Sequence, residues 1–199
     1  MQDLKFGKKR RKQVLKRKKQ INREKRNKQP ILGWIFQILG VCILAFVLVF
    51  YFGQRISNTG ESMKPQLNNG DIVLVNRLVY DAMSPKRGDI IAFKPNGNEN
   101  MHYSIKRIVG LPGESVQIQD GKVYIDGNEL KEDIYVEEVD KPGIAEQVIE
   151  LGSDEYFVLG DNTENSDDSR MANIGNIKRS DIDGKIWFHF GKGQFGFVK

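Results

Sequence analysis

The sequence predicts a mostly β protein that follows one N-terminal membrane-spanning helix. An uncharged run of 22 residues at 31–52 indicates the helix. Beyond it, turn-forming residues recur about every eight to twelve positions between β-branched and aromatic runs, and no stretch has the periodicity of a further long helix. The 199 residues (22.8 kDa) allow one domain of ordinary size with extensions. We expect three parts: a basic tail (1–30), a span (31–53) and a β-rich domain (54–199).

The run 31–52 is long enough to cross a bilayer as a helix. At about 1.5 Å per residue it covers roughly 33 Å, whereas a hydrocarbon core is about 30 Å thick. Trp34 and Tyr51 lie near its ends, where aromatic rings favour the membrane–water interface. Buried helices of soluble proteins seldom run this long without a polar face, and a cleaved secretory signal has a shorter apolar region. We therefore expect an uncleaved, single-pass anchor.

Charge is divided unevenly between the tail and the rest of the chain. Residues 1–30 hold 14 of the 31 basic and 2 of the 26 acidic side chains, which leaves 17 basic and 24 acidic residues after the tail. The basic flank predicts a cytoplasmic N-terminus and an extracytoplasmic β-rich domain at the cell membrane. The tail is also suited to anionic phospholipid headgroups, although a topology signal alone explains it equally well. The acidic domain argues against nucleic-acid binding.

Cysteine and histidine are too scarce for several kinds of site. The single cysteine, Cys42, excludes an internal disulfide and a cysteine-built zinc site, and two histidines, His102 and His189, offer little to a metal. We expect no metal and no cofactor. Neither histidine accompanies a Gly-x-Ser-x-Gly nucleophile run, so a histidine-assisted serine is not indicated. A lysine base remains, provided that burial lowers its pKa well below the ordinary value of about 10.4.

The candidate strands are bounded by turn residues. A hairpin is predicted at Asp120-Gly121, because glycine supplies the positive φ that a tight turn requires. The segment 129–146 is acidic and weakly patterned, and we expect a solvated loop or a small excursion there. The predicted strands cover residues 72–76, 89–93, 105–109, 115–118, 122–125, 156–159 and 185–190.

Three segments carry side chains suited to peptide hydrolysis. Ser62 opens the run 62–65 (Ser-Met-Lys-Pro), soon after the span. Lys106 lies in the predicted strand 105–109, where alternation puts it on the opposite face from Arg107. The run 160–170 is rich in Asp, Asn and Ser, which suit a loop fixed by side-chain-to-backbone hydrogen bonds. Taken singly, each segment has a plainer interpretation: a turn, a solvated lysine on an edge strand, and an acidic loop without the spacing of a calcium site.

In this order after one anchor, the three segments closely resemble the type I signal peptidases of bacteria. The matching runs are 62–65 (Ser-Met-x-Pro), 106–113 (Lys-Arg-Ile-Val-Gly-Leu-Pro-Gly) and 160–170 (Gly-Asp-Asn-x-x-x-Ser-x-Asp-Ser-Arg), and the run 87–91 is similar to a family segment. The resemblance implies a signal-peptidase-like β-rich fold of the single-span form seen in Gram-positive members. It implies a membrane-anchored serine endopeptidase that removes signal peptides from secreted precursor proteins, near the secretion translocon.

The resemblance also implies a role for each matching side chain. Ser62 is then the nucleophile, and neutral Lys106 is the general base that takes its proton and later donates one to the leaving amine. Ser166 matches a hydroxyl that orients the lysine amine. Asp168 and Arg170 match a pair that braces the loop.

The substrate-binding side of the expected site departs from the family pattern. Met63 is expected to line the substrate cleft, and the substrates are expected to carry small residues one and three positions before the cut. The chain has Gly60 where some members carry a Ser or Thr hydroxyl, so the Ser62 backbone N–H is the expected oxyanion donor in the Gly60 region. Thr163 stands where the family loop often has Arg.

Two other functions compete with the peptidase. A non-catalytic or pilin-dedicated relative would act in surface-protein assembly and bind subunits without cutting them, but the retention of Ser62 and Lys106 argues against it. A Ser-Lys self-cleaving regulator on a similar β core is disfavoured by the membrane span and by the lack of a DNA-reading segment. The sequence favours the peptidase, with precursor proteins and the phospholipid membrane as partners.

Overall fold

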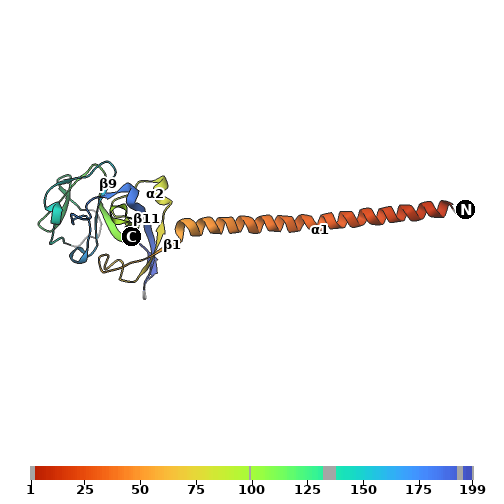
Figure 1. The fold of residues 1–199 in the computed structure, drawn as a ribbon, viewed down its shortest axis with the longest axis horizontal. Helices are drawn as coiled ribbons and strands as arrows, with labels where there is room; N and C mark the ends of the chain where they lie inside the picture. The colour runs from red at the N-terminus through yellow and green to blue at the C-terminus, as the bar shows by residue number, and fades with distance from the viewer. Residues whose placement is uncertain (1–2, 99, 132–137, 192–194, 199) are drawn as a thin grey trace. The chain divides into compact units, whose positions relative to one another are not determined.

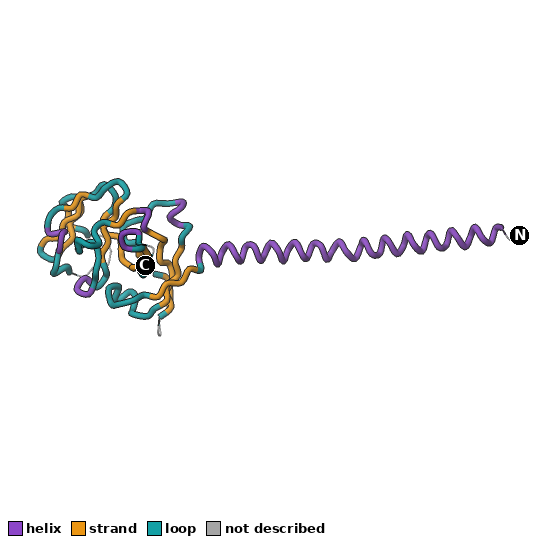
Figure 2. Tube along the Cα trace, viewed as in Figure 1, coloured by secondary structure: helices purple, strands orange, loops and turns teal. Residues whose placement is uncertain are grey.

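A computed structural model describes residues 3–98, 100–131, 138–191 and 195–198, with the side chains of the N-terminal helix described for residues 13–21 and from 31 onward. Two compact units, Met1–Leu48 and Val49–Lys199, are considered separately. Helix makes up the described part of the first unit, and strands and loops dominate the second (Figure 2).

The first unit is a single long helix that continues into the start of the second. α1 (Asp3–Phe52) joins the basic tail to the apolar run without a break, so the tail is helical from Asp3 onward. Its part Ile31–Phe52 is long and apolar enough to cross a membrane, and the side chains of residues 31–50 are exposed. A helix that is apolar on every side suits a lipid environment, which is consistent with the predicted anchor.

The second unit contains two sheets whose described strand pairs are all antiparallel. The larger has the order β1-β2-β11-β3-β4-β9-β10, with β12 paired to β11, and the smaller has the order β7-β6-β5-β8. Figure 1 labels β1, β9 and β11 of the larger sheet. The larger sheet comprises β1 (Gln54–Ser57), β2 (Ile72–Asn76), β3 (Ile90–Phe93), β4 (Ser104–Gly110), β9 (Glu155–Leu159), β10 (Ile177–Lys178), β11 (Ile182–Phe190) and β12 (Phe195–Phe197), and the smaller comprises β5 (Ser115–Gln119), β6 (Lys122–Ile125), β7 (Asn128–Glu129) and β8 (Ile149–Glu150). The expected mostly β fold is confirmed.

Short helical segments connect the strands. α2 (Val79–Ala82) is one turn long, in agreement with the expectation of no further long helix. The 3₁₀ turns are η1 (Pro95–Gly97), η2 (Gly143–Glu146), η3 (Thr163–Asn165) and η4 (Arg179–Asp181). The predicted hairpin is confirmed, since Asp120 and Gly121 have φ values of 49° and 76° and join β5 to β6.

Three groups of buried apolar side chains form the core. One lies under the smaller sheet and includes Val116 and Phe157, and a second surrounds β3 and β9 and includes Phe93 and Ile108. The third packs the turn after β1 against the larger sheet through Leu67 and neighbouring residues. These groups secure both faces of β4, the strand that carries the predicted base.

The expected solvated loop or small excursion at 129–146 agrees with most of the described residues there, which are exposed, but two apolar residues are buried. Val139 is 1% exposed and Ala145 is fully buried, and both belong to the core under the smaller sheet. The carbonyl oxygens of Glu138 and Lys141 accept hydrogen bonds from side chains of the loop 160–170. Charged residues around the two apolar positions obscured their burial in the sequence. Residues 132–137 lie outside the described part of the chain.

Candidate active site

Lys106 lies on a central strand of the larger sheet. β4 pairs with β3 on one side and with β9 on the other, and Lys106 stands opposite Ile91. The residue is 6% exposed, so it is not a solvated lysine on an edge strand. Its amine nitrogen lies 2.9 Å from the Ser62 Oγ and 3.2 Å from the Ile105 carbonyl oxygen. The structure therefore brings together two groups that are 44 positions apart in the sequence.

Burial lowers the pKa of the Lys106 amine, because the charged ammonium form loses solvation. The carboxylates of Asp168 and Asp167 act in the opposite direction, since nearby negative charge favours the ammonium form, and the guanidinium of Arg170 lowers the pKa further. The net direction is downward. The surroundings of Lys106 thus favour a neutral amine, which is the form that can accept a proton.

Ser62 lies in the turn that follows β1 and is 8% exposed. Its carbonyl oxygen accepts a hydrogen bond of 3.0 Å from the Asn162 N–H, which joins this turn to the loop 160–170. Gly160 packs directly against the same carbonyl. A Cβ at Gly160 would lie 2.5 Å from the Ser62 carbonyl oxygen and would overlap the Ser166 Oγ. A side chain is therefore excluded at position 160.

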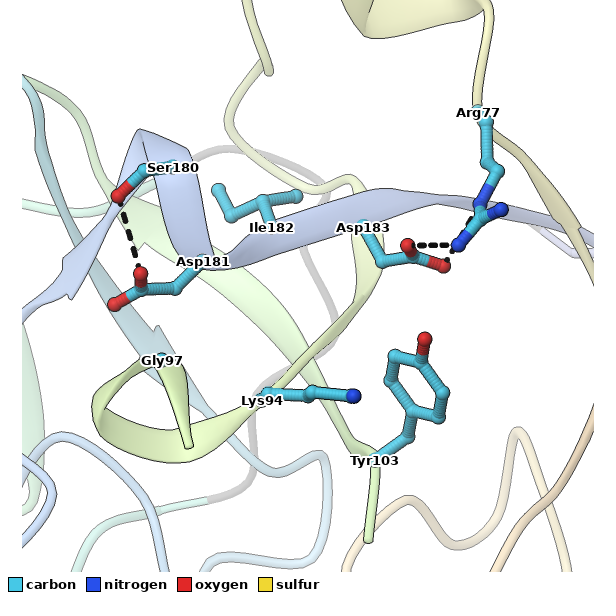
Figure 3. Close-up of a pocket in the computed structure, with 8 residues that line it drawn as sticks. All are labelled: Arg77, Lys94, Gly97, Tyr103, Ser180, Asp181, Ile182 and Asp183. Carbon is cyan, nitrogen blue, oxygen red and sulfur yellow. Dashed lines mark hydrogen bonds and ion pairs between the residues drawn. The ribbon is translucent and has the colours of Figure 1, made fainter. Parts of the chain in front are cut away.

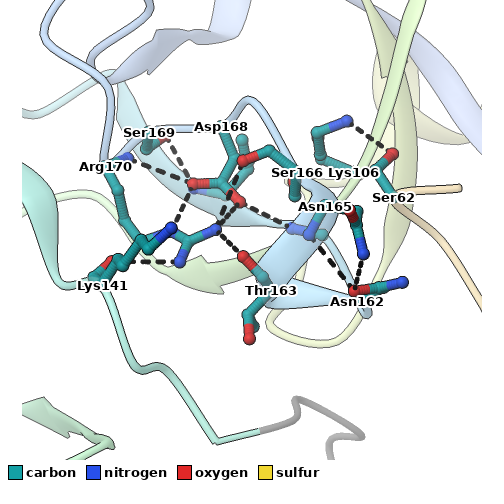
Figure 4. Close-up of polar contacts among 12 residues, drawn as sticks. Ser62, Lys106, Lys141, Asn162, Thr163, Asn165, Ser166, Asp168, Ser169 and Arg170 are labelled. Atoms are coloured by element: carbon teal, nitrogen blue, oxygen red, sulfur yellow. Dashed lines mark hydrogen bonds and ion pairs between the residues drawn. The ribbon is translucent and has the colours of Figure 1, made fainter. Parts of the chain in front are cut away.

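A buried ion pair fixes the loop 160–170 (Figure 4). Asp168 is fully buried and Arg170 is 2% exposed, with distances of 2.8 Å between Nε and Oδ1 and 2.9 Å between Nη2 and Oδ2. The Gly160 N–H also donates to Asp168 Oδ2 at 3.1 Å. Arg170 donates further to the carbonyl oxygens of Thr163 and Lys141. Because nearly every polar atom of the pair is satisfied, the loop has a defined conformation next to Ser62.

A second buried ion pair was not predicted from the sequence. Arg107 makes two contacts of 2.7 Å with Asp161 and donates to the Gly88 carbonyl oxygen at 2.9 Å. Strand alternation placed Arg107 on the face opposite Lys106 but gave no reason for its burial. The pairing of β4 with β9 explains the contact, because Arg107 stands opposite Leu159 and Asp161 follows Leu159 by two residues. This ion pair anchors the start of the loop 160–170 to β4.

A cleft of about 470 Å³ opens beside the serine–lysine pair. Its walls come from the turn before Ser62, from β4, from the segment around η1 and from the loop 160–170 and the turn after it. The lining residues are Thr59, Gly60, Glu61, Ser62, Pro95, Asn96, Met101, Ser104, Lys106, Asn165, Asp167, Asn173 and Ile174. A buried serine–lysine pair at the wall of such a cleft is suited to attack on a peptide carbonyl.

Comparison with known proteins agrees with this chemistry. The family model for signal peptidase, peptidase S26, matches residues 31–190. This chain belongs to the signal peptidase family. A signal peptidase I P of Bacillus subtilis subsp. natto is 34% identical over 171 residues, which cover 82% of this chain and 90% of that relative. A signal peptidase IB of Staphylococcus aureus (strain COL) is 32% identical over 184 residues, which cover 82% of this chain and 91% of that relative.

A solved structure of a signal peptidase I from Enterococcus faecalis V583 is 33% identical to this signal peptidase, with a TM-score of 0.40. The match covers 52% of this chain and 97% of that one. The enzyme class expected from the sequence, a signal peptidase I, is confirmed by the family and its relatives.

The structure places Met63 elsewhere than the sequence predicted, and it leaves the Ser166 hydroxyl without a hydrogen bond to Lys106. Met63 is fully buried and packs with Leu67 in the core, so it does not line the cleft. The turn that places Ser62 at the wall of the cleft directs the next side chain inward. The Ser166 hydroxyl does not hydrogen-bond to Lys106; it is buried beside Gly160 and has no hydrogen-bond partner among the described residues.

A separate cavity of about 310 Å³ shares the turn η1 with the cleft (Figure 3). Arg77 and Asp183 form an ion pair in its wall, with Nε and Oδ2 3.2 Å apart. The Lys94 amine lies 5.3 Å from the centre of the Tyr103 ring. This cavity is polar, and its serine, Ser180, donates a hydrogen bond to Asp181 at 3.1 Å. The cleft holds the hydrogen-bonded serine–lysine pair and is therefore the candidate site of this signal peptidase. In the part of the chain that the structure describes, no group of His, Cys, Asp and Glu side chains is arranged to hold a metal ion.

Proposed function

We propose that this signal peptidase removes signal peptides from secreted precursors with Ser62 as nucleophile and Lys106 as general base. The observation that carries the proposal is the 2.9 Å separation of the Ser62 Oγ and the buried Lys106 amine. The family and its named relatives supply the reaction, and this pair supplies the chemistry.

The reaction proceeds in two halves. The neutral Lys106 amine takes the Ser62 proton as Oγ bonds to the scissile carbonyl carbon, and the resulting ammonium gives that proton to the nitrogen of the leaving amine as the C–N bond breaks. Lys106 then takes a proton from water, whose oxygen attacks the acyl-serine. The same proton returns to Ser62 Oγ when the ester bond breaks. Each half begins and ends with a neutral amine.

The negative charge that develops on the carbonyl oxygen needs hydrogen-bond donors. The Ser62 backbone N–H has no hydrogen-bond partner in the described part of the chain, so it is available as one donor. Gly60 contributes no hydroxyl, and its own N–H donates to Asn69 Oδ1 at 3.0 Å. The oxyanion site that we propose is therefore built from backbone in the Gly60–Ser62 turn.

Three further residues are proposed to hold Ser62 and Lys106 in position. Asp168 and Arg170 brace the loop 160–170, which contacts Ser62 through the Asn162 N–H. Ser166 is proposed to orient the Lys106 amine during the reaction, because its buried hydroxyl has no other partner in the described part of the chain.

The topology follows from charge and chain length. The basic tail 1–30 keeps the N-terminus in the cytoplasm, Ile31–Phe52 crosses the membrane once, and the catalytic domain lies outside. Ser62 follows Phe52 by ten residues, a length of at most about 36 Å when extended. The nucleophile thus stays near a substrate held in the same membrane, close to the translocon that delivers it. We expect small residues at one and three positions before the cut.

Full-length protein in detergent, with a precursor as substrate, tests the proposal. Ser62→Ala and Lys106→Met are expected to remain folded and to lose cleavage by at least about a thousandfold. Ser57→Ala, an exposed serine on β1, and Lys86→Met, an exposed lysine, are matched controls expected to cleave normally. Retained cleavage in Ser62→Ala or Lys106→Met would remove the dyad. A wild type that binds precursors without cutting them would favour an assembly role instead.

A further inference from the structure

Two carboxylates line the catalytic cleft without a part in the proposed mechanism, and they differ in their partners. The ionisable residues that line the cleft are Lys106, Glu61 and Asp167. Glu61 is paired with Lys64 at the rim. Asp167 is exposed and has no ion-pair partner among the residues that the structure describes. The cleft therefore presents an uncompensated negative charge to whatever chain lies in it.

The two neighbouring aspartates of the loop 160–170 differ in their surroundings. Asp168 is fully buried and satisfied by Arg170, whereas Asp167 turns into the cleft and is solvated. The negative charge of Asp167 favours the positively charged form of the Lys106 amine and so raises its pKa. Among the charged neighbours of Lys106, only Asp168 has a larger effect. The field of Asp167 thus reaches the place where the scissile bond must lie.

The charge of the cleft during binding is negative overall. In the proposed mechanism Lys106 is neutral before reaction, so it does not balance Asp167. The chain after the tail has 17 basic and 24 acidic residues, so the long-range field has the same sign. An extended substrate advances about 3.3 Å per residue, which keeps the residues nearest the scissile bond within the cleft that holds both Ser62 and Asp167.

We propose that Asp167 is a specificity-determining residue that favours precursors with Lys or Arg within two positions of the cut and disfavours Asp or Glu there. The proposal rests on the proposed function, because it assumes that the scissile bond lies at Ser62. It concerns the variable positions −2, +1 and +2. The small residues expected at −1 and −3 are outside its scope.

Peptides that differ at one position test the proposal with the full-length enzyme in detergent. Gln, Lys and Glu are placed in turn at −2, +1 or +2 of one sequence, and kcat/KM is measured for each peptide. The wild type is expected to prefer Lys to Gln by about two- to fivefold in at least one position, the range of an exposed ion pair, and less at 1 M salt. Asp167→Asn should abolish the preference, and Asp167→Lys should reverse it.

Glu164→Gln is the matched control, because Glu164 is an exposed carboxylate in the same loop that does not line the cleft. It should leave the ratio between peptides unchanged. Asp167→Asn also affects the pKa of Lys106, but that effect is common to all peptides and cancels in the ratio. Equal ratios in wild type, Asp167→Asn and Asp167→Lys at all three positions would overturn the proposal. Cleavage of the Gln peptide by Ser62→Ala would overturn the proposed function, and this proposal with it.

Discussion

Replacing Asp168 by Asn removes one negative charge from the buried ion pair and preserves the shape of the side chain. Asp168 accepts hydrogen bonds from the Nε, Nη2 and backbone N–H of Arg170 and from the Gly160 N–H. The Asn amide can replace only one acceptor oxygen, and its NH₂ group would face another donor. Arg170, 2% exposed, would keep a charge without a counter-charge.

The expected loss follows from that burial. Breaking a buried ion pair by removing one partner costs about 3–5 kcal/mol, because the remaining charge stays desolvated. For a domain of this size, 1 kcal/mol corresponds to about 2–4 °C in Tm, so Asp168→Asn should lower the Tm by roughly 6–20 °C. Adding Arg170→Gln should restore part of the loss, since the uncompensated charge is then removed.

Thermal unfolding of the detergent-solubilised chain measures this effect. In a Trp34→Phe background, the fluorescence of Trp187 in β11 reports on the catalytic domain alone. Glu129→Gln disrupts the exposed pair with Lys122 and should leave the Tm unchanged, which makes it the control. A Tm for Asp168→Asn within about 2 °C of that control would refute the reasoning that the buried pair stabilises the loop 160–170.

Two further predictions concern activity. Cleavage should decline as the pH falls through the pKa of Lys106, because the protonated amine cannot act as a base. Burial lowers that pKa, and the negative charge of Asp168 raises it. Removal of the Asp168 charge should therefore move the acid limb of the pH–rate profile to lower pH. A pH–rate profile that shows no fall at low pH, or a fall that does not shift when the Asp168 charge is removed, would contradict this. Thr163→Val should cost about 1–3 kcal/mol in unfolding free energy and reduce kcat, because the Thr163 hydroxyl donates to the Glu138 carbonyl oxygen at 2.7 Å. Thr163→Ser should behave as wild type, and equal losses in both variants would exclude a role for the hydroxyl.

Local patterns predicted the longer elements well. The strands with clear alternation, such as β2 and β6, were found with the bounds that the structure has, and the hairpin at 120–121 follows from its turn residues alone. The pattern missed β1, which has four residues, and four strands of two or three residues, too few for a period to emerge: β7, β8, β10 and β12. Tertiary pairing with a longer neighbour defines them instead.

The sequence alone determined the family, an apolar run long enough to cross a membrane, and the chemical types of the side chains in the candidate site, because these depend on ordered motifs and composition. Only the tertiary structure decided which side chains are in contact and which are buried from solvent. Ser62 and Lys106 meet across 44 positions, and Arg107 pairs with Asp161 across 54. Met63 and Lys106 are both buried by segments that lie far apart in the chain, so their burial cannot be read from local sequence. Burial lowers the pKa of the Lys106 amine and so favours the neutral form that can accept a proton.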